Sequence, residues 1–354
     1  MTELSTILAQ ITPLDTRAMA AAETRQGQLT KPPQALGRLE SISIRLAGIT
    51  GNPLPSMARK TIAVMAADHG VVAEGVSAYP AEVTPQMVYN FIAGGAAINV
   101  LGRHVGARVL VTDVGVAADM SGVAGVRQKK VRAGTANMAQ GAAMTRDEAL
   151  RAFAVGIELV EEEIANGLDL IATGEMGIGN TTPSSALVAA FTGLPVALVT
   201  GRGTGISDQA LERKVQVIER ALAVNQPDMH DPIDVMAKVG GVEIAAMAGV
   251  MLCAAAHRIP VVMDGFISGA AALTAARLCP TVIDYILPSH ISAEVGHQVV
   301  FAELGLTPLF NLEMRLGEGT GAALAMSIID AAAKILSEMA TFEGAGVTGE
   351  MVDE

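Results

Sequence analysis

The stretch Leu168-Asp169-Leu170-Ile171-Ala172-Thr173-Gly174-Glu175-Met176-Gly177-Ile178-Gly179-Asn180-Thr181-Thr182 decides the fold of this chain. A short apolar run is followed at once by a glycine-rich turn. A buried strand that turns directly toward a helix is typical of a parallel sheet covered by helices. Glu175 lies in the turn, where its glycine neighbours allow a ligand to approach the backbone closely.

Short β-branched runs alternate with helical patterns along the rest of the chain from about residue 60. Several of these runs end in Gly, Asp or Glu, and Thr145 with Glu148 forms a capping box at one helix start. We therefore predict an α/β fold with a doubly wound, mostly parallel, Rossmann-like sheet, whose ligands bind beyond the carboxyl ends of the strands. The predicted strands lie at 61–66, 108–113, 168–173, 196–200, 259–264 and 282–287.

Both ends of the chain carry helical periodicity without a convincing strand. We expect residues 1–58 and 322–354 to form a small helical subdomain. It would lie beside a large α/β domain of residues 59–321 that binds substrate and carries the catalytic groups. The acidic, glycine-bearing tail Gly344–Glu354 is expected to be mobile.

Composition narrows the class of protein. The 354 residues are 51% hydrophobic and 17% charged, and the mean hydropathy of +0.42 raises the question of a membrane. The longest charge-free stretch, Met176–Gly201, contains polar residues and Pro195, which would leave polar groups in lipid. The N-terminus lacks the pattern of a signal peptide. We predict a cytoplasmic protein without a membrane span, and the net charge of −12 argues against a nucleic-acid partner.

A second glycine-bracketed carboxylate occurs in Leu316-Gly317-Glu318-Gly319-Thr320-Gly321, just before an apolar helical pattern over 320–340. The first N–H groups of that helix would point toward an anion. Two such carboxylates at predicted strand ends indicate acid–base chemistry beside a phosphate, with Glu318 and Glu175 as candidate bases. The alternative is that each Glu caps a helix or forms a surface ion pair.

A third glycine loop, Gly201-Arg202-Gly203-Thr204-Gly205, follows the run at 196–200, and Lys214 lies one helical stretch downstream. The amides of Gly177 to Thr182 could cradle a phosphate, with Lys214 as the counter-charge. A solvated lysine and a packing turn fit the spacing equally well. The chain has neither the P-loop nor the dinucleotide-binding glycine pattern.

Metal and covalent chemistry find little support in the sequence. The six histidines are scattered, and Asp68-His69 fits a structural pair better than a ligand pair. Cys253 and Cys279 stand alone in apolar surroundings, and no nucleophile elbow occurs. We therefore predict no metal site and no cofactor, which leaves Glu318 and Glu175 as the candidate catalytic groups.

Several separated motifs together resemble one known family, the nicotinate-nucleotide:dimethylbenzimidazole phosphoribosyltransferases of cobalamin lower-ligand assembly. The resemblance runs through almost the whole chain, and its motifs occur in the family's order. The matching segments are Lys31–Glu40, Ala66–Val71, Glu74–Ser77, Gly174–Thr182, Asp264–Ser268, Ser289-His290 with Ser292, and Leu316–Gly321.

The resemblance implies a role for each matched position. Glu318 would be the general base, and a lysine like Lys214 would accompany the phosphate loop. The segment from Ser77 to Gln86 resembles the lining of the aromatic base pocket. Family membership also implies a homodimer that acts on nicotinate mononucleotide and dimethylbenzimidazole. The remaining matched substrate-binding positions are Gly177, Gly179, Asn180, Thr181, Thr182, Gly203, Asp264, Gly265, Ser292, Leu316, Gly319, Thr320 and Gly321.

Two other functions remain open on the sequence alone. One is a phosphoribosyltransferase that uses a pyrophosphate-activated sugar and magnesium, although the chain lacks the adjacent acidic pair at a strand end that such enzymes carry. The other is a binder that stores an aromatic base or nucleotide. Burying a carboxylate in an apolar pocket costs free energy of desolvation. A protein that only binds its ligand would gain little from such a carboxylate, which argues against the binder.

Overall fold

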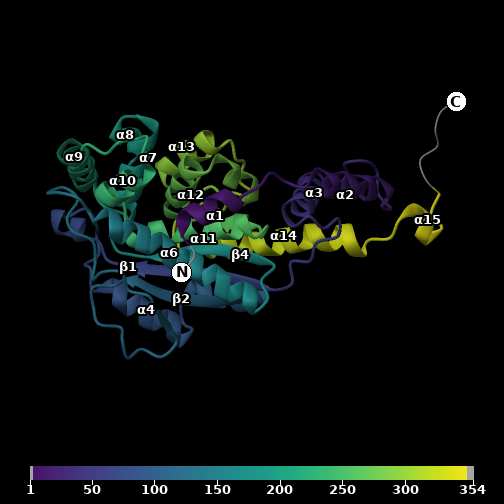
Figure 1. Ribbon diagram of the computed structural model, residues 1–354, viewed down its shortest axis with the longest axis horizontal. Coiled ribbons are helices and arrows are strands. Elements are labelled where there is room, and N and C mark those ends of the chain that lie inside the picture. The colour runs from purple at the N-terminus through teal and green to yellow at the C-terminus, as the bar shows by residue number, and fades with distance from the viewer. Residues whose placement is uncertain (1–2, 349–354) are drawn as a thin grey trace.

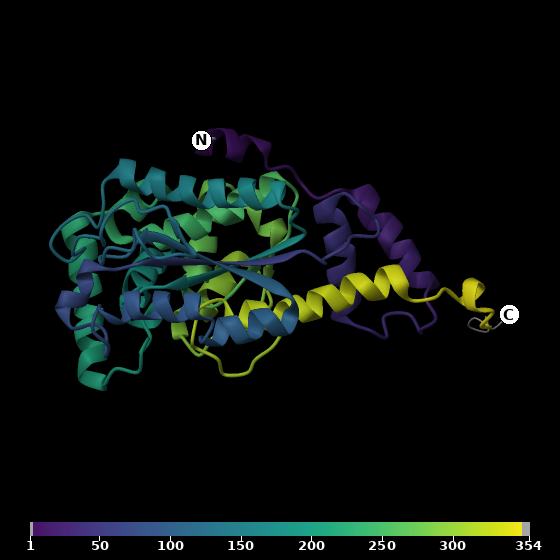
Figure 2. The same cartoon turned by 90° about the horizontal axis from the view of Figure 1, so that it is seen from below.

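The computed structural model describes residues 3–348, so part of the predicted mobile tail, residues 349–354, lies outside the described residues. A six-stranded parallel sheet forms its centre, with the strand order β3-β2-β1-β4-β5-β6 (Figures 1 and 2). The predicted α/β class with a parallel sheet is confirmed. The strands are β1 Lys60–Ala67, β2 Ala107–Gly115, β3 Val126–Gln128, β4 Leu170–Met176, β5 Val261–Met263 and β6 Ile286–Pro288.

The strand order reverses between β1 and β4, which are neighbours in the sheet. The chain moves outward from β1 to β3 and then returns to build β4 to β6 on the other side. Both central strands are buried along their whole length, which explains their continuous apolar sequence. A reversal of this kind opens a crevice beyond the carboxyl ends of the strands, and ligands bind there in doubly wound sheets.

Helices cover both faces of the sheet, as the two views show (Figures 1 and 2). One buried apolar cluster lies under α6, α7, α11 and α12, and a second lies under α4, α5 and α14. The helices that carry the site are α4 Val83–Ala93, α5 Ala97–Val105, α7 Thr181–Thr192, α9 Asp208–Asn225, α11 Val242–Ala256, α12 Phe266–Leu278, α13 Val295–Leu304 and α14 Thr320–Glu338. The others are α1 Leu4–Gln10, α2 Thr16–Gln28, α3 Arg38–Thr50, α6 Arg146–Ala165, α8 Val196–Val199, α10 Pro232–Val239 and α15 Phe342–Ala345, with 3₁₀ turns η1 Gly70–Glu74 and η2 Pro280–Tyr285.

Most predicted strands are present, but one prediction is wrong. The run at 196–200 forms the short helix α8, because Pro195 starts a turn that packs back onto α7 and α13 and does not reach the sheet. The run at 282–287 is split between η2 and β6, and the strand predicted at 168–173 extends to Met176. Strand β3 was not predicted, since three residues are too few to show a period.

The helical ends of the chain pack in two places. Helices α2 and α3 lie against α14, and Arg25 of α2 donates hydrogen bonds to the carbonyls of Leu336 and Ser337 at the end of α14. Helix α1 instead packs on α11 and α6 beside the sheet (Figure 2). The division into residues 1–58 with 322–354 and residues 59–321 therefore stays a prediction.

Helix α14 is long and apolar enough, by length and composition, to cross a membrane. However, 56% of its apolar window is buried inside the protein. It packs against α5, β4 and β5 and against α2 and α3, which is the environment of a core helix.

Two glycines let α6 and α11 approach each other closely. A Cβ on Gly156 would overlap the carbonyl oxygen of Ala246, and a Cβ on Gly249 would overlap that of Phe153. We expect Gly249→Ala to lower the free energy of unfolding by about 1–3 kcal/mol, because backbone oxygen cannot move away as a side chain can. Urea unfolding would measure the change. Gly122→Ala is the control, since nothing lies within 4 Å of that Cβ, and equal stability of the two variants would contradict the prediction.

Candidate active site

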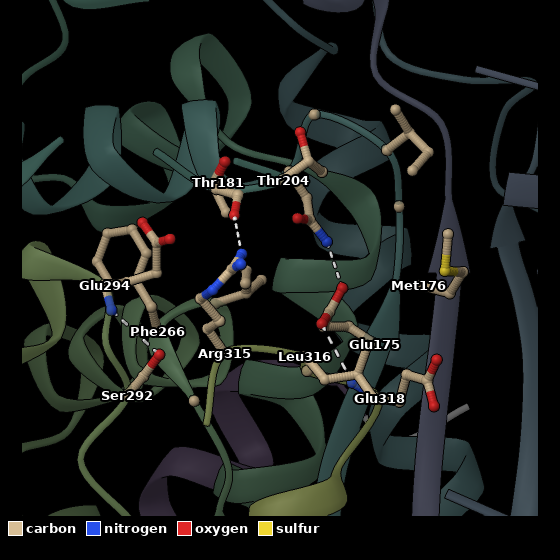
Figure 3. A pocket seen from close by; sticks show the side chains of 18 of the residues that line it. Glu175, Met176, Thr181, Thr204, Phe266, Ser292, Glu294, Arg315, Leu316 and Glu318 are labelled. Atoms are coloured by element: carbon tan, nitrogen blue, oxygen red, sulfur yellow. Dashed lines mark hydrogen bonds between the residues drawn. The ribbon is translucent and has the colours of Figure 1, made fainter. Parts of the chain in front are cut away.

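A cavity of about 490 Å³ lies beyond the carboxyl ends of β4, β5 and β6 (Figure 3). Its walls come from the loops after these strands, the segment before α4, the glycine loop before α9 and the glycine loop before α14. The crevice predicted from the strand reversal is thus a real cavity, and it contains both carboxylates that the sequence singled out, Glu175 and Glu318.

Glu318 occupies an unusual backbone conformation. Its φ is +64°, and Gly317 and Gly319 on either side have φ values of +82° and +92°. Left-handed conformations are favourable for glycine and costly for a residue with a Cβ. Such strain is typical of functional positions that the surrounding structure holds in place.

Asp264, which follows β5, provides that support. Its Oδ2 accepts a hydrogen bond from the Gly319 amide at 3.1 Å, and its Oδ1 accepts one from the Ala322 amide at 2.9 Å. Burial raises the pKa of Asp264 to about 6, against the opposing effect of these backbone N–H groups. The carboxylate thus holds the start of α14, and with it the loop that carries Glu318.

The carboxylate of Glu318 is buried and lines the cavity. Its Oε2 accepts a hydrogen bond from the Ile98 amide at 3.4 Å, at the start of α5. Burial raises the pKa of Glu318, the Ile98 hydrogen bond opposes this shift, and the charge of Asp264 adds to it. A carboxylate with a raised pKa is a stronger base near neutral pH.

Glu175 stands at the end of β4, beside Glu318 (Figure 3). Its Oε1 accepts a hydrogen bond from the Glu318 amide at 3.4 Å, and its Oε2 accepts one from the side-chain amide of Asn180. Burial raises the pKa of Glu175 to about 8, with further increases from the charges of Glu243 and Asp264. Glu175 is therefore protonated at neutral pH, which leaves Glu318 as the better base.

His69 lies next to Gly177 of the cavity lining, since a Cβ on Gly177 would come within 3.1 Å of Nε2 of His69. Its Nε2 is 2.7 Å from Oε1 of Glu243 in the first turn of α11, and both side chains are buried. Asp68 accepts a hydrogen bond from the Ala117 amide instead. Within residues 3–348, no three His, Cys, Asp or Glu side chains come together as a metal-ligand group.

The other end of the cavity is built around Lys214 on α9. Its Nζ donates to Oγ1 of Thr181 at 2.7 Å and to the carbonyl of Gly201 at 3.1 Å. Burial lowers the pKa of Lys214 to about 8, and the charge of Glu294 opposes that shift. Arg315 adds a second cation, and it donates to the Gly203 carbonyl at 3.4 Å. An anion at Thr181 and Gly203 would be close to both cations.

We expect Lys214→Met to raise the KM for a nucleotide substrate by about 10- to 100-fold, because a charge-assisted hydrogen bond contributes about 1.5–3 kcal/mol. In the wild type the same KM should rise above pH 8, where Lys214 loses its proton in the empty site. Steady-state kinetics would test both statements. The same substrate without its phosphate is the control, and an equal effect on its KM would point to a purely structural lysine.

The cavity brings together most of the predicted site residues. Those that line it are Glu175, Glu318, Ser77, Gly177, Gly179, Asn180, Thr181, Gly203, Asp264, Gly265, Ser292 and Leu316. The residues that lie behind the lining are Thr182, Lys214, Gly319, Thr320 and Gly321. Gln86 is exposed on α4, where its neighbours Val83 and Met87 line the cavity instead.

Gly321 illustrates how a residue behind the lining serves the site. A Cβ at this position would overlap the imidazole of His290, which lines the cavity. The glycine therefore makes room for His290 beside the first turn of α14.

Sequence reasoning missed several lining side chains. His290 and Glu294 flank Ser292, which was the only site residue assigned in that segment. The spacing of four residues between Val83 and Met87 is a helical signal that could have identified one wall. Arg315 immediately precedes the predicted loop. Tyr79 lies in the segment from Ser77 to Gln86 that was expected to line the base pocket. The other lining side chains that were not assigned individually are Val76, Met176, Ile178, Thr204, Phe266, Ile267 and Ser268.

Comparison with known proteins gives one consistent result. Residues 11–347 match the family model DBI_PRT, described as a phosphoribosyltransferase. A nicotinate-nucleotide–dimethylbenzimidazole phosphoribosyltransferase from Chloroflexus aggregans is 59% identical over 98% of this chain and 99% of its own length. The protein of that name from Geobacter sulfurreducens is 57% identical over 98% of this chain and 99% of its length.

Solved structures agree with the sequence matches. A crystal structure of CobT from Thermus thermophilus superposes with a TM-score of 0.90 at 50% identity, covering 94% of this chain and 99% of that one. The family resemblance drawn from the motifs is thereby confirmed. With its crevice at the strand reversal and its glycine-bracketed Glu318, this chain belongs to the DBI_PRT family of phosphoribosyltransferases.

Proposed function

We propose that this protein transfers the phosphoribosyl group of nicotinate mononucleotide to dimethylbenzimidazole, which gives α-ribazole phosphate and nicotinate for the lower ligand of cobalamin. Relatives named for these two substrates match nearly the whole chain, which supports the assignment. The observation that carries the mechanism is the pair Glu175 and Glu318, held together in one buried cavity with cations at its other end.

The chemistry of the substrates suits this cavity. The pyridine nitrogen of nicotinate mononucleotide is positively charged, so it leaves C1′ of the ribose as a neutral ring nitrogen. One nitrogen of dimethylbenzimidazole forms the new bond to C1′ while the bond to the pyridine nitrogen breaks. Attack from the opposite side inverts the β-linked nucleotide to an α-linked product.

Glu318 is assigned the role of general base. The second ring nitrogen of dimethylbenzimidazole carries an N–H, and its proton must be removed as the new bond forms. A carboxylate within hydrogen-bond reach can accept that proton, and the raised pKa of Glu318 strengthens it as a base. Glu175, protonated at neutral pH, supports the loop of Glu318 and orients the ribose.

The phosphate is assigned to the end with Thr181 and Gly203. The helix that starts at Thr181 presents its first N–H groups there, and Lys214 lies directly behind. Val83, Met87 and Met176 offer apolar surface for the flat aromatic base near Glu318.

The test is to incubate the purified protein with nicotinate mononucleotide and dimethylbenzimidazole and to follow nicotinate release and the anomeric form of the product. We expect nicotinate and an α-linked product. Turnover only with 5-phosphoribosyl pyrophosphate and magnesium would favour the rival transferase. Tight nucleotide binding without turnover would favour the binder.

We also propose that the protein is a cytoplasmic homodimer, as the resemblance to the family implies. Light scattering of the purified protein at several concentrations would measure its mass. A mass that corresponds to one chain at every concentration would contradict the dimer.

A further inference from the structure

His69 and Glu243 form a buried pair that the proposed reaction does not use. His69 lies just beyond the end of β1, and Glu243 lies in the first turn of α11. Nε2 of His69 is 2.7 Å from Oε1 of Glu243, and the two side chains are 1% and 0% exposed. A carboxylate can only accept a hydrogen bond, so Nε2 donates it. His69 is the only hydrogen-bond partner of the Glu243 side chain within residues 3–348.

Two glycines lie against this pair. A Cβ on Gly241 would come within 2.6 Å of Cε1 of His69 and within 2.8 Å of Oε2 of Glu243. A Cβ on Gly177 would come within 3.1 Å of Nε2 of His69. Glycine at both positions therefore leaves room for the ring and the carboxylate. Gly177 belongs to the turn after β4 and lines the cavity, so the pair packs directly against the cavity lining.

The same turn carries Asn180. A Cβ on Gly177 would also lie 3.4 Å from Nδ2 of Asn180, so the imidazole and the side-chain amide lie beside the same backbone position. Nδ2 of Asn180 donates a hydrogen bond to Oε2 of Glu175. The other carboxyl oxygen of Glu175 accepts a hydrogen bond from the Glu318 amide at 3.4 Å (Figure 3). A path of contacts therefore runs from His69 through the turn to the carboxyl beside Glu318.

The sheet does not hold this turn. The hydrogen-bonded ladder between β1 and β4 ends at Met176. Beyond it, the Asn180 amide donates to the Gly177 carbonyl at 3.1 Å within the turn. The Ile178 amide donates to Oγ1 of Thr84 on α4, also at 3.1 Å. Packing against the imidazole is thus a further restraint on the turn, from the side of β1 and α11.

Glu243 also acts on Glu175 through its charge. Burial is the largest cause of the raised pKa of Glu175, the hydrogen bond from Asn180 opposes it, and the negative charge of Glu243 adds to it. The pair is therefore coupled to Glu175 by charge as well as by packing. Neither His69 nor Glu243 lines this cavity, so neither is placed to contact a substrate there.

We propose that His69 and Glu243 are positioning residues for the transfer reaction. They hold the turn that carries Asn180, and Asn180 fixes the carboxyl of Glu175. Glu175 in turn supports the loop of the base Glu318. The inference rests on the proposed function, since the step that the pair assists is the transfer to the aromatic base.

The alternative is that the pair only stabilises the fold. Removing one partner of a buried charged pair destabilises a protein strongly, whereas replacing both partners by apolar residues of similar volume is often neutral. The double variant His69→Leu/Glu243→Leu therefore separates the two roles. It should unfold at nearly the same urea concentration as wild type, but it lacks the flat, hydrogen-bonded ring beside Gly177.

The experiment measures kcat with saturating nicotinate mononucleotide and dimethylbenzimidazole, and urea unfolding confirms that each variant is folded. His69→Gln can place an amide N–H where Nε2 lies, whereas the shorter side chain in His69→Asn cannot reach Glu243. We expect kcat to fall about 10- to 100-fold in His69→Asn and in the double leucine variant, because small displacements of catalytic groups have effects of this size. In His69→Gln the loss should be only a few-fold. His69→Asn and the double variant test the inference separately, so either one decides it if the other does not fold.

Asn180→Ala tests the path of contacts. In the Asn180→Ala protein, the addition of His69→Asn should lower kcat only a few-fold further, because residues that act through one shared contact have non-additive effects. The double variant Thr61→Val/Glu163→Leu is the matched control. It replaces another buried hydrogen-bonded pair, at the start of β1 and thus at the end of the strand away from the cavity. Its kcat should equal that of wild type.

Wild-type kcat in a folded His69→Leu/Glu243→Leu protein would overturn the inference. The same conclusion would follow if His69→Asn caused as large a loss in the Asn180→Ala protein as in wild type. Absence of turnover in wild type would instead refute the proposed function, and that result is distinct from a normal rate in the variants.

Discussion

In Glu318→Gln, nicotinate release in the presence of dimethylbenzimidazole is expected to fall by a factor of about 10²–10⁴, the usual contribution of a positioned general base. Glutamine keeps the length of the side chain and can still accept the hydrogen bond from the Ile98 amide. It cannot take the proton from the attacking base. The affinity for nicotinate mononucleotide should therefore change only a few-fold, and calorimetry beside single-turnover kinetics would separate the two quantities.

The pH dependence of the same reaction gives a second readout of Glu318. A base acts only when it is deprotonated, so kcat should fall as the pH drops through its pKa. Because burial raises that pKa above its ordinary value of 4.5, the inflection should lie above the range of an exposed carboxylate. The residual activity of Glu318→Gln should not show this inflection. A wild-type profile that is flat down to pH 4.5 would contradict a raised pKa.

In Gly174→Ala, the expected loss of kcat is about 10²-fold. Gly174 lies in β4 directly beneath the loop of Glu318, and a Cβ there would overlap the carbonyl oxygen of Glu318 and come within 2.7 Å of its carbonyl carbon. The neighbour is backbone in a strained conformation, so the loop must shift. A displacement of about 1 Å in a catalytic group can cost about 10²-fold in rate.

This substitution adds one methyl group and removes no functional atom. Gly141→Ala is its control, since nothing lies within 4 Å of that Cβ. The predicted pattern is a low kcat with a folded protein that still binds nicotinate mononucleotide. Wild-type kcat in a folded Gly174→Ala protein would show that the loop tolerates the methyl group, and the close contact would then have no catalytic importance.

The strands and the catalytic loops could be predicted because their signals are local. An apolar run followed by glycines, as at Gly174 to Gly179, reports a buried strand and its turn within about ten residues. The glycines around Glu318 likewise report a left-handed backbone before any contact is known. Residues 196–200 misled the prediction, because β-branched residues suit a strand and tertiary packing placed them in a helix.

The rest of the site depends on contacts between distant segments. The link from Asp264 to the start of α14 joins residues 55 and 58 positions apart, and no local pattern reports it. Lys214 was predicted from its charge, but its position behind Thr181 required the fold of α9. Gln86 was predicted to bind substrate because the segment from Ser77 to Gln86 resembles the lining of the base pocket. The structure of α4 was needed to show that Val83 and Met87 face the cavity instead.

Helix α14 joins the catalytic loop to the packed ends of the chain. Its 19 residues span about 28 Å, at about 1.5 Å per residue. Asp264 holds its first turn, and Arg25 holds its last. Over that length, a tilt of about two degrees corresponds to a displacement of about 1 Å at the opposite end. The far end of α14 packs on α2 and α3. The alignment of Glu318 therefore also depends on side chains in these two helices, which lie outside the cavity.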